Sequence, residues 1–530
     1  MWTFGWRNQV WESLGRTEWD LVIIGGGITG AGILREATRL GLRSVLFEAH
    51  DFASGTSSRS SKLVHGGLRY LKNAQIRLTS ESVHEREHLL MEGRGLITPL
   101  PFLMANFRGD HIPAWVFGIG LSFYDLLALK WNHAAYSADG LRQLCPQLTS
   151  DELSSGFRYF DAQTDDARLV LRVIQEAVAG GGTALNYTRV DGLLKTSRSQ
   201  VCGVQVTDLG VDANGRTCEV HARMVINASG AWADEVRRLN GGLGRMRILR
   251  GSHLFFPFEK LPLSRAVTFL HPSDGRPVFI FPWEGVTLVG TTDMDHHARL
   301  GTNIAISPEE AAYLMDSVHF AFPDLGLTLQ DVRSTLAGAR AVVDTGKTDP
   351  SKESREFVLW LENGLLTVSG GKLTTFRIMA HKALRAIQAV QKGFNPVSDR
   401  RQRVLDALPS ESTLCDLPPE LRLRLLGRYG ASACDLVKAA SQGEMQAMPG
   451  GMTLWAELRW AARAEGVQHL EDLLARRVRC AITQPNGGVD LLQKVGDIVR
   501  EELGWGDDRW QAEAEAYRNL WRTYHAPVSD

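Results

Sequence analysis

The sequence predicts an α/β protein in which a parallel sheet with flanking helices is joined to an antiparallel sheet and followed by a helical C-terminal region. Three observations predict this. A strand, a glycine-rich turn, a helix and a second strand follow one another within residues 20–48. Short strand-like runs such as "RPVFIFPW" and "VTLVGTTD" fill residues 245–300. Helical periodicity dominates residues 417–520.

The composition is that of a large soluble protein without a global charge. The 530 residues suggest two to four domains at roughly 150 residues each, and 44% hydrophobic and 22% charged residues allow a sizeable core. A net charge of −1 provides no overall positive field, which argues against nucleic acid as a partner. The six cysteines form no CxxC pair and no zinc spacing, which predicts reduced thiols in a cytoplasmic protein and no metal site: Cys145, Cys202, Cys218, Cys415, Cys434 and Cys480.

No segment is predicted to span a membrane or to act as a secretory signal. The N-terminal "MWTFGWRNQVWESLG" lacks a long apolar region, and we expect its aromatic residues to pack on the protein. The longest apolar run, "AWVFGIGLSFYDLLAL", is interrupted by Ser122 and Asp125. It is too short and too polar for a span, and so it predicts a buried or interfacial helix.

The first strand–turn–helix–strand unit carries a dinucleotide fingerprint. Gly25 permits the tight turn, Gly27 lets the backbone approach a pyrophosphate, and Gly30 lets the helix pack against the sheet. The helix N-terminus supplies N–H groups for phosphate. Glu48, at the end of the second strand, suits ribose hydroxyls.

The fingerprint alone does not decide between NAD and FAD. The long polar run after Glu48, "TSSRSSKLVHGGLRYL", favours a flavin, because a dehydrogenase that uses NAD would continue with alternating strand and helix. Its hydroxyls and the N–H groups of a glycine pair are expected to line the flavin, and its lysine to neutralise phosphate or flavin charge: Thr56, Ser57, Ser58, Ser60, Ser61, Gly66, Gly67 and Lys62.

Two later segments, "RMVINASG" (223–230) and "GLLTVSGG" (364–371), are predicted as further strands of the parallel sheet. Near the C-terminus, apolar residues recur at helical spacing at Val489, Leu492, Val495 and Ile498. We therefore expect a separate helical domain, joined through the polar stretch "GFNPVSDRRQR".

Seven segments in one order make the chain recognisable: "GGGITGAG", "SSRSSKLVHGGLRYL", "FDAQTDDARLVL", "NASGAWAD", "GSH", "GTTD" and "SGGKLTTFR". From about residue 18 to 520 the chain resembles the FAD-dependent glycerol-3-phosphate dehydrogenases, which pass electrons to quinone. The resemblance implies a glutathione-reductase-like FAD domain, an inserted antiparallel substrate domain and a helical cap. The FAD domain is expected to comprise residues 1–88, 158–235 and 335–392. The substrate domain is expected to comprise residues 89–157 and 236–334, and the helical cap residues 393–530.

The resemblance also implies the site residues. Noncovalent FAD is expected near His65 and along the two later strands, at Ala228, Gly230, Gly371, Leu373 and Thr374. A phosphate clamp is expected from Arg69, Tyr70, Arg340, Arg355 and Lys372, since a planar guanidinium meets two phosphate oxygens. Arg340 lies in an apolar strand, where a buried cation needs an anionic partner. The catalytic residues are expected to be His253, Lys372 and Arg340. The proton acceptor is open between His253, which titrates near neutrality, Lys372, which would need a depressed pKa, and His65, which is expected nearer the flavin.

The implied reaction is oxidation of sn-glycerol 3-phosphate to dihydroxyacetone phosphate, with hydride passing to FAD and electrons to membrane quinone. The implied location is the inner face of the cell membrane, with peripheral attachment through residues 2–11 or 114–129, and a homodimer is allowed. Three alternatives stay open. They are an oxygen-using glycerol-3-phosphate oxidase, a flavin oxidoreductase for amines or amino acids, and a flavin-binding regulatory or assembly protein without turnover.

Overall fold

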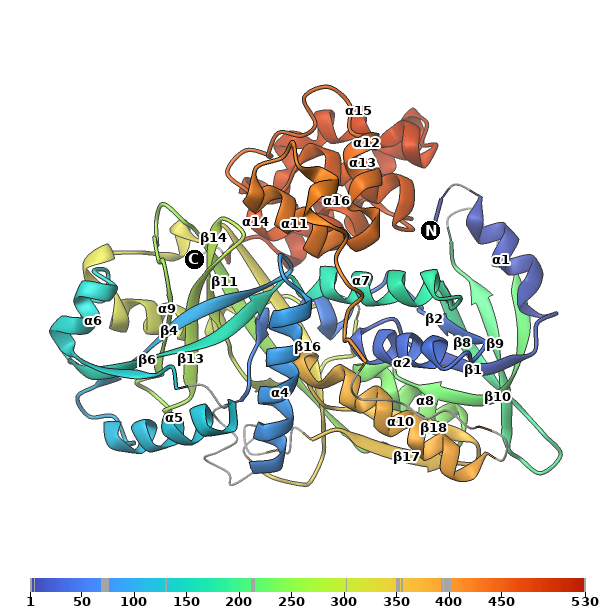
Figure 1. Ribbon diagram of the computed structural model, residues 1–530, viewed down its shortest axis with the longest axis horizontal. Coiled ribbons are helices and arrows are strands. Elements are labelled where there is room, and N and C mark those ends of the chain that lie inside the picture. Colours follow the sequence, from blue (N-terminus) through green and yellow to red (C-terminus); the bar gives the residue numbers. More distant parts are fainter. Residues whose placement is uncertain are drawn as a thin grey trace.

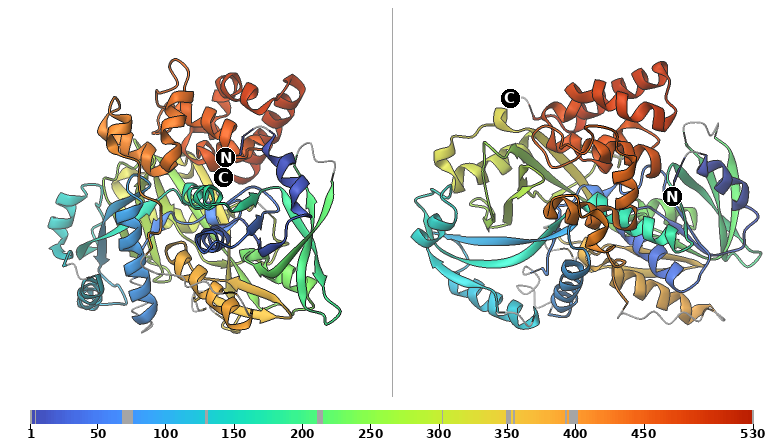
Figure 2. Two further views of the ribbon diagram at one scale, coloured as in Figure 1. Left: turned by 45° about the vertical axis from the view of Figure 1, so that its right-hand side comes forward. Right: turned by 45° about the horizontal axis from the view of Figure 1, so that its top comes forward.

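The computed structural model describes residues 2–3, 5–67, 76–128, 131–210, 215–301, 303–348, 353, 356–391, 394 and 402–528. In these residues the chain forms two β-sheets side by side, with C-terminal helices lying across them (Figure 1). Figure 2 shows the same three parts from two other directions. The predicted combination of a parallel sheet, an antiparallel sheet and a helical C-terminal region is confirmed.

The first sheet has the predicted strand–turn–helix–strand unit at its centre. β1 (Trp19–Ile24) pairs in parallel with β2 (Ser44–Phe47) on one side and with β10 (Thr217–Asn227) on the other. β10 pairs in parallel with β18 (Leu365–Ser369), so both of the later predicted strands join this sheet. Its other strands are β7 (Thr183–Leu185), β8 (Thr188–Lys195), β9 (Val201–Asp208) and β17 (Val358–Glu362).

Helix α2 (Ile28–Arg39) follows the glycine turn and is buried along most of its length. It packs against α7 (Asp166–Ala179) on one side and α10 (Phe376–Val390) on the other. Because other elements enclose it, even the charged residues Arg35 and Glu36 of this helix are buried. The other helices near this sheet are α1 (Trp6–Leu14) and α8 (Ala233–Leu239).

The second sheet is mostly antiparallel and contains the strands predicted between residues 245 and 300. In it β11 (Met246–Pro257) lies between β14 (Val286–Gly290) and β16 (Ser334–Val343). The sheet also contains β3 (Leu63–Val64), β4 (Ile97–Phe107), β5 (Ala134–Ser137), β6 (Leu153–Thr164), β12 (Ala266–Leu270), β13 (Pro277–Trp283) and β15 (Met294–Asp295). The associated helices are α4 (Ile76–Glu92), α5 (Ala114–Ala128), α6 (Ala138–Leu144) and α9 (Pro308–Ala321).

The change from one sheet to the other occurs at different residues from the predicted domain boundaries. The predicted FAD domain resumed at residue 158, but β6 pairs with β4 as far as Thr164. The prediction also gave all of 335–392 to the FAD domain, whereas β16 pairs with β11 through Val343. Hydrophobic periodicity identifies such segments as strands without showing which sheet they join.

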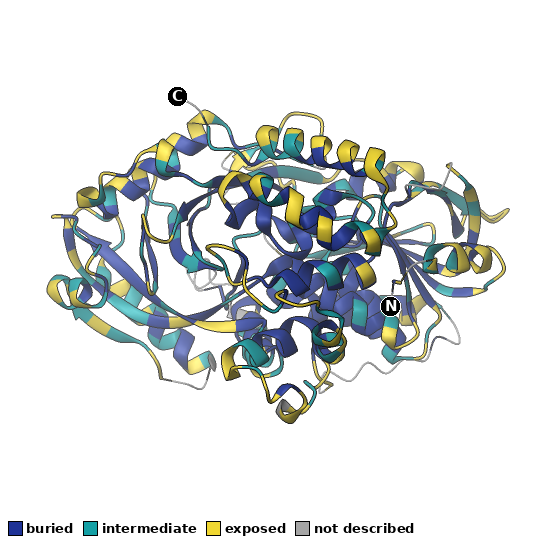
Figure 3. Ribbon diagram, turned by 90° about the horizontal axis from the view of Figure 1, so that it is seen from above, coloured by how far each residue is buried: buried dark blue, intermediate teal, exposed yellow. Residues whose placement is uncertain are grey.

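The C-terminal helices form a cap with its own apolar core. The predicted helical spacing is confirmed in α15 (Leu492–Leu503), where Leu492, Val495 and Ile498 are buried. The other helices are α11 (Pro419–Tyr429), α12 (Ala433–Ala439), α13 (Trp455–Ala464), α14 (Cys480–Thr483) and α16 (Asp507–Tyr524), with a π-helix at Asp472–Arg477. Figure 3, which looks down on the cap, shows buried residues gathered toward the middle of the molecule and exposed residues around its rim.

The aromatic residues near the N-terminus pack on the protein, as predicted. Trp2 and Trp11 are buried, and the ring of Trp2 stacks on Phe52 with the two centroids 4.9 Å apart. Among the described residues, none of the helices has the length and apolar character needed to cross a bilayer. All six cysteines are free thiols, as expected.

Candidate active site

The glycine fingerprint forms a closely packed turn between β1 and α2. Gly25 has a φ of 111°, and a Cβ there would lie 2.6 Å from the carbonyl oxygen of Ala228. A Cβ on Gly30 would lie only 2.0 Å from the carbonyl oxygen of Gly25. Because real Cβ atoms do not approach a carbonyl so closely, the crossing of strand and helix depends on glycine at both positions.

Glu48 lies at the carboxyl end of β2, beside this turn. Its Oε2 accepts a hydrogen bond from the Gly26 N–H at 2.7 Å, and its Oε1 accepts one from the His50 N–H at 2.9 Å. Burial raises the pKa of this carboxyl. A carboxylate next to a helix N-terminus matches the chemistry of a dinucleotide, whose ribose hydroxyls donate and whose pyrophosphate accepts. The residues present therefore fit the adenosine diphosphate half of FAD.

Several hydroxyls of the polar run bond to protein groups and so fix the loop itself. Ser57 Oγ accepts from the Ile28 N–H at 2.9 Å, which closes the loop over the N-terminus of α2. The Thr56 hydroxyl donates to the Ala339 carbonyl at 2.5 Å. The Ser60 hydroxyl donates to Asp166 Oδ2 at 2.8 Å. Side chains that we predicted to line a flavin are thus engaged in shaping the segment around it.

Lys62 is completely buried inside the protein, beside Asp166 and Trp283. Its Nζ lies 3.1 Å from Asp166 Oδ1 and 5.1 Å from the centre of the Trp283 ring. Burial and the nearby Arg479 together lower the pKa of Lys62 to about 8, although Asp166 acts in the opposite direction. Since Asp166 already compensates this charge, the structure does not support the predicted role in neutralising the cofactor.

The segment "SGGKLTTFR" meets the end of the polar run. The Thr374 hydroxyl donates to the His65 carbonyl at 3.4 Å, although the two residues are far apart in the sequence. Thr374 belongs to a 3₁₀ turn, Leu373–Thr375, immediately before α10. Lys372 Nζ donates to Ser82 Oγ at 3.3 Å, which directs this side chain toward α4.

The glycines predicted to contact the cofactor differ in their surroundings. A Cβ on Gly66 would lie 2.3 Å from Tyr124 Oη, and the Gly66 N–H already donates to that hydroxyl at 2.9 Å. A Cβ on Gly371 would lie 2.5 Å from Met379 Sδ. Gly66 and Gly371 therefore permit close packing within the protein. Gly230 differs, because nothing lies within 4 Å of a Cβ placed there.

Arg340 and His253 lie on the neighbouring strands β16 and β11. Arg340 is opposite Leu249, and His253 lies four positions further along that strand, on the same face. The pair between them consists of Gly251 and Gly338, and other side chains pack over both: a Cβ on Gly338 would lie 2.5 Å from the Arg59 Cβ, and one on Gly251 would lie 2.9 Å from Thr291 Oγ1. The Arg340 guanidinium passes over Gly251, with Nη2 3.4 Å from a Cβ placed there.

Arg340 was expected to need an anionic partner, and the structure provides one in Asp293, a residue of the "GTTD" segment. Arg340 Nη1 lies 3.1 Å from Asp293 Oδ1, and the arginine side chain keeps 27% of its surface exposed. The guanidinium therefore has a carboxylate that orients it and an accessible side that can receive an anion.

His253 is almost completely buried, and its Nε2 lies 2.9 Å from Ser61 Oγ. Burial lowers the pKa of His253 to about 3, and the positive charges of Lys62 and Arg340 act in the same direction. The prediction that His253 titrates near neutrality is wrong for this reason. The imidazole is instead neutral at physiological pH, and burial and the two cations make it a weak base as long as no anion is bound beside them.

Two buried neutral histidines should make the protein sensitive to acid. The pKa values of His253 and His525 are both lowered to about 3, against about 6.5 in an unfolded chain. Between these values the unfolded state binds more protons, so the free energy of unfolding should fall as the pH is lowered from 6.5, by up to about 1.4 kcal/mol per pH unit for each histidine. Above pH 6.5 this effect should be absent.

Denaturant unfolding at pH 7.5 and 5.5 measures this dependence. In the wild type, His525 Nδ1 lies 3.0 Å from the Thr335 carbonyl oxygen, and in the variant His525→Asn the asparagine amide can donate to the same carbonyl. The free energy of unfolding of this variant should depend less steeply on pH, by the contribution of one histidine. An unchanged dependence in this variant would contradict the assignment.

Three predicted substrate residues, Arg69, Tyr70 and Arg355, lie outside the described residues. Sequence reasoning missed the contact of Asp293 with Arg340. It also missed Arg59, which packs over Gly338 of β16 and donates from Nη1 to the Ala337 carbonyl at 3.2 Å. It placed Ser61 near the flavin but missed its contact with His253. The "GTTD" segment was visible in the sequence, but its contact with Arg340 depends on the pairing of β11 with β15 and β16.

Comparisons with known proteins agree with this geometry. Residues 20–377 match the family model described as FAD dependent oxidoreductase, and residues 370–510 match the C-terminal domain of alpha-glycerophosphate oxidase. An aerobic glycerol-3-phosphate dehydrogenase of Staphylococcus haemolyticus is 34% identical over 499 residues, which cover 89% of this chain and 88% of that protein. The enzyme of the same name from Staphylococcus aureus strain USA300 is 33% identical over 542 residues, covering 96% and 95%.

Solved structures extend the likeness to the whole fold. A glycerol-3-phosphate dehydrogenase from Bacillus halodurans, solved with FAD, superposes with a TM-score of 0.80 at 26% identity and covers 100% of both chains. An L-alpha-glycerophosphate oxidase from Mycoplasma pneumoniae, with FAD bound, shares the fold with a TM-score of 0.57 at 16% identity, over 74% of this chain and all of that one. The chain therefore belongs to the FAD-dependent oxidoreductases and, within them, to the aerobic glycerol-3-phosphate dehydrogenase family.

Proposed function

We propose that the protein oxidises sn-glycerol 3-phosphate to dihydroxyacetone phosphate and passes the electrons to a membrane quinone. The observation that carries the proposal is the placement of Arg340 and His253 on one sheet face, separated by a pair of glycines. A guanidinium for the phosphate and a neutral imidazole for a proton are the two groups that this substrate requires. The names of the relatives that match most of the chain support the same substrate.

In the proposed mechanism FAD supplies the acceptor for the hydride that leaves C2. The cradle of Gly25, Gly30 and Glu48 would hold its adenosine diphosphate half. Arg340, oriented by Asp293, binds the substrate phosphate. His253 takes the proton of the C2 hydroxyl. Ser61 is hydrogen-bonded to His253 Nε2 and is less buried than the histidine, so its hydroxyl connects the imidazole to the substrate. The roles proposed for Arg69, Tyr70, Arg355 and Lys372 are additional contacts with the phosphate.

An anaerobic titration tests the reaction directly. Adding sn-glycerol 3-phosphate to the purified holoprotein should bleach the flavin absorbance, whereas glycerol at the same concentration should not. Bleaching by an amine or amino acid but not by the phosphorylated alcohol would replace the proposal with the amino-acid class. Retention of FAD without bleaching by any of these would indicate a protein without turnover.

Molecular oxygen is the second candidate acceptor, because the matched C-terminal model is named for an oxidase. The peroxide formed per substrate oxidised, measured with and without a quinone analogue, separates the two acceptors. A quinone-linked enzyme should form little peroxide and should reduce the analogue. We also propose that the protein forms a homodimer, which light scattering of the purified holoprotein tests.

We propose that α5 attaches the protein to the inner face of the cell membrane. Trp115, Ile119 and Leu126 on this helix expose 67%, 62% and 60% of their surface, and Trp131 just after it exposes 70%. Tryptophan beside exposed aliphatic residues is typical of helices that lie in a membrane interface. In Figures 1 and 2 the helix lies on the side of the molecule away from the cap.

Replacing Trp115 and Ile119 together with serine should reduce binding to phospholipid vesicles by about tenfold or more, because less apolar surface enters the interface. Co-sedimentation with vesicles measures this binding. Leu243→Ser is a matched control, since Leu243 is 81% exposed but lies outside the helix. Reduction of a soluble acceptor should be unchanged in both variants. Co-sedimentation of the double variant at the wild-type level would contradict the proposal.

A further inference from the structure

Three arginines from one short segment of the cap reach into the part of the chain that holds the nucleotide. They are Arg476, Arg477 and Arg479, which we call the arginine clamp. The first two end the π-helix Asp472–Arg477, and Arg479 follows with a positive φ of 61°. All three are at most 3% exposed. A positive φ is uncommon for a residue other than glycine, so the backbone conformation of Arg479 is one that the surrounding fold holds in place.

The first contact of the clamp is with Asp51, which follows Glu48 closely in the sequence. Arg476 Nε lies 2.6 Å from Asp51 Oδ2, and Arg477 Nη2 lies 2.8 Å from Asp51 Oδ1. Burial by itself would raise the pKa of Asp51, but the two guanidinium groups lower it to about 2. The carboxylate is completely buried, and its charge is compensated by the cap.

The second contact of the clamp is with the polar run itself. Arg479 Nη2 donates to the Ser58 carbonyl at 2.8 Å and to Asp166 Oδ1 at 3.2 Å. The other oxygen of Asp166 accepts from the Ser60 N–H at 3.0 Å and from the Ser60 hydroxyl at 2.8 Å. Arg479 therefore fixes the backbone on both sides of Arg59.

The segment held in this way, residues 48–62, forms one wall of the nucleotide cradle. The Ala53 N–H donates to the Gly26 carbonyl at 3.0 Å, and Ser57 Oγ accepts from the first N–H of α2. On its other side the Thr56 hydroxyl donates to the Ala339 carbonyl, next to Arg340. A shift of this segment would therefore disturb the fingerprint turn and the strand of the phosphate-binding arginine together.

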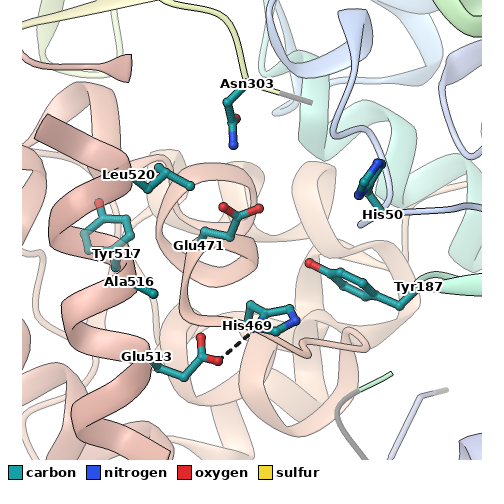
Figure 4. Close-up of a pocket in the computed structure, with 9 residues that line it drawn as sticks. All are labelled: His50, Tyr187, Asn303, His469, Glu471, Glu513, Ala516, Tyr517 and Leu520. Carbon is teal, nitrogen blue, oxygen red and sulfur yellow. Dashed lines mark hydrogen bonds and ion pairs between the residues drawn. The ribbon is translucent and has the colours of Figure 1, made fainter. Parts of the chain in front are cut away.

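Apolar packing does not close the whole boundary between the cap and this segment. A cavity of about 300 Å³ lies beside it, lined by His50 and Tyr187 on one side and by cap residues such as Glu471 and Tyr517 on the other (Figure 4). Buried ions are unfavourable unless they are paired. With the cap displaced, Asp51 would lose both of its guanidinium partners, and the Ser58 carbonyl would lose the Arg479 donor.

We propose that the cap is part of the FAD-binding apparatus: the arginine clamp holds residues 48–62 in the conformation that binds FAD, so that cofactor binding and cap docking stabilise each other. The clamp residues are positioning residues, which act through segment 48–62. The inference rests on the FAD dependence of the family and is independent of the substrate proposed above. By linkage, a cap that favours FAD binding must be held more firmly when FAD is bound.

The variants Arg479→Met and Arg479→Lys test the clamp. The methionine variant should raise the dissociation constant of FAD for the apoprotein by about tenfold or more, and lysine, which keeps the charge, should recover part of the affinity. Quenching of flavin fluorescence measures both constants. Arg459→Met is the matched control, because Arg459 contacts Glu444 at 2.7 Å and Glu502 at 2.8 Å within the cap. It should leave FAD affinity unchanged even if it lowers the melting temperature of the apoprotein.

Hydrogen exchange of the wild-type apoprotein gives an independent test that needs no variant. Adding FAD should slow amide exchange in residues 465–480 of the cap as well as in residues 48–62. Wild-type FAD affinity in folded Arg479→Met would overturn the proposal, and so would exchange in 465–480 that does not respond to FAD. Neither measurement uses a substrate, so the proposal on the reaction can fail while this one stands.

Discussion

Replacing Arg340 with alanine should raise the KM for sn-glycerol 3-phosphate by on the order of 100-fold, because loss of one partner of a desolvated charge pair is worth about 2–5 kcal/mol. Arg340 lies along the same sheet face as His253, is oriented by Asp293 and keeps 27% of its side-chain surface exposed. The effect should appear mainly in binding, with a smaller change in the rate of flavin reduction at saturating substrate. Stopped-flow reduction over a range of substrate concentrations separates the two.

Two controls sharpen this prediction. Arg340→Lys keeps the charge but loses the planar fork, and its KM should lie between those of the wild type and the alanine variant. Any slow oxidation of unphosphorylated glycerol should be unaffected by either substitution. A KM for the phosphorylated substrate that stays at the wild-type value in Arg340→Ala would remove Arg340 from the phosphate site.

Replacing His253 with glutamine should slow flavin reduction by roughly 10²–10⁴-fold, the usual contribution of a positioned base. Glutamine can occupy a similar position beside Ser61 but cannot accept the proton. Substrate affinity, measured as the concentration that gives half the maximal reduction rate, should change little. Because the pKa of His253 is lowered to about 3, the wild-type reduction rate should show no loss from protonation of this imidazole between pH 5 and 8.

His525→Asn is the matched control for His253→Gln. Both histidines are buried and have a pKa lowered to about 3, but His525 contacts the Thr335 carbonyl near the C-terminus. Its replacement should affect stability and leave reduction fast. A reduction rate in His253→Gln within a few fold of the wild type would assign the proton to another acceptor.

Much of the nucleotide-binding part is predictable from sequence because its signals are local. A continuous apolar run, three glycines and a helical repeat lie within one short stretch, and Gly25 and Gly30 occupy the positions that steric contact requires. The strands at 223–230 and 364–371 are predictable for the same reason. The resemblance added the order of the parts and the identity of the cofactor.

The polar run shows the limit of this reasoning. Its hydroxyls and lysine suggest ligand contacts, yet Thr56, Ser60 and Lys62 bond to Ala339 and Asp166. A side chain that can bind a cofactor can equally satisfy a buried group of the protein. Which of these it does depends on what the fold brings near it.

The sequence by itself determined that this protein has a dinucleotide fingerprint, a mainly antiparallel second sheet and a helical C-terminal region, because each depends on residues that are neighbours in the chain. Only the tertiary structure decided that β16 joins the second sheet, that His253 is neutral, and that the cap arginines neutralise Asp51. These properties depend on strand pairing, on burial and on charges contributed by residues that are distant in the sequence. No local pattern encodes a desolvation energy or the partner of a buried ion.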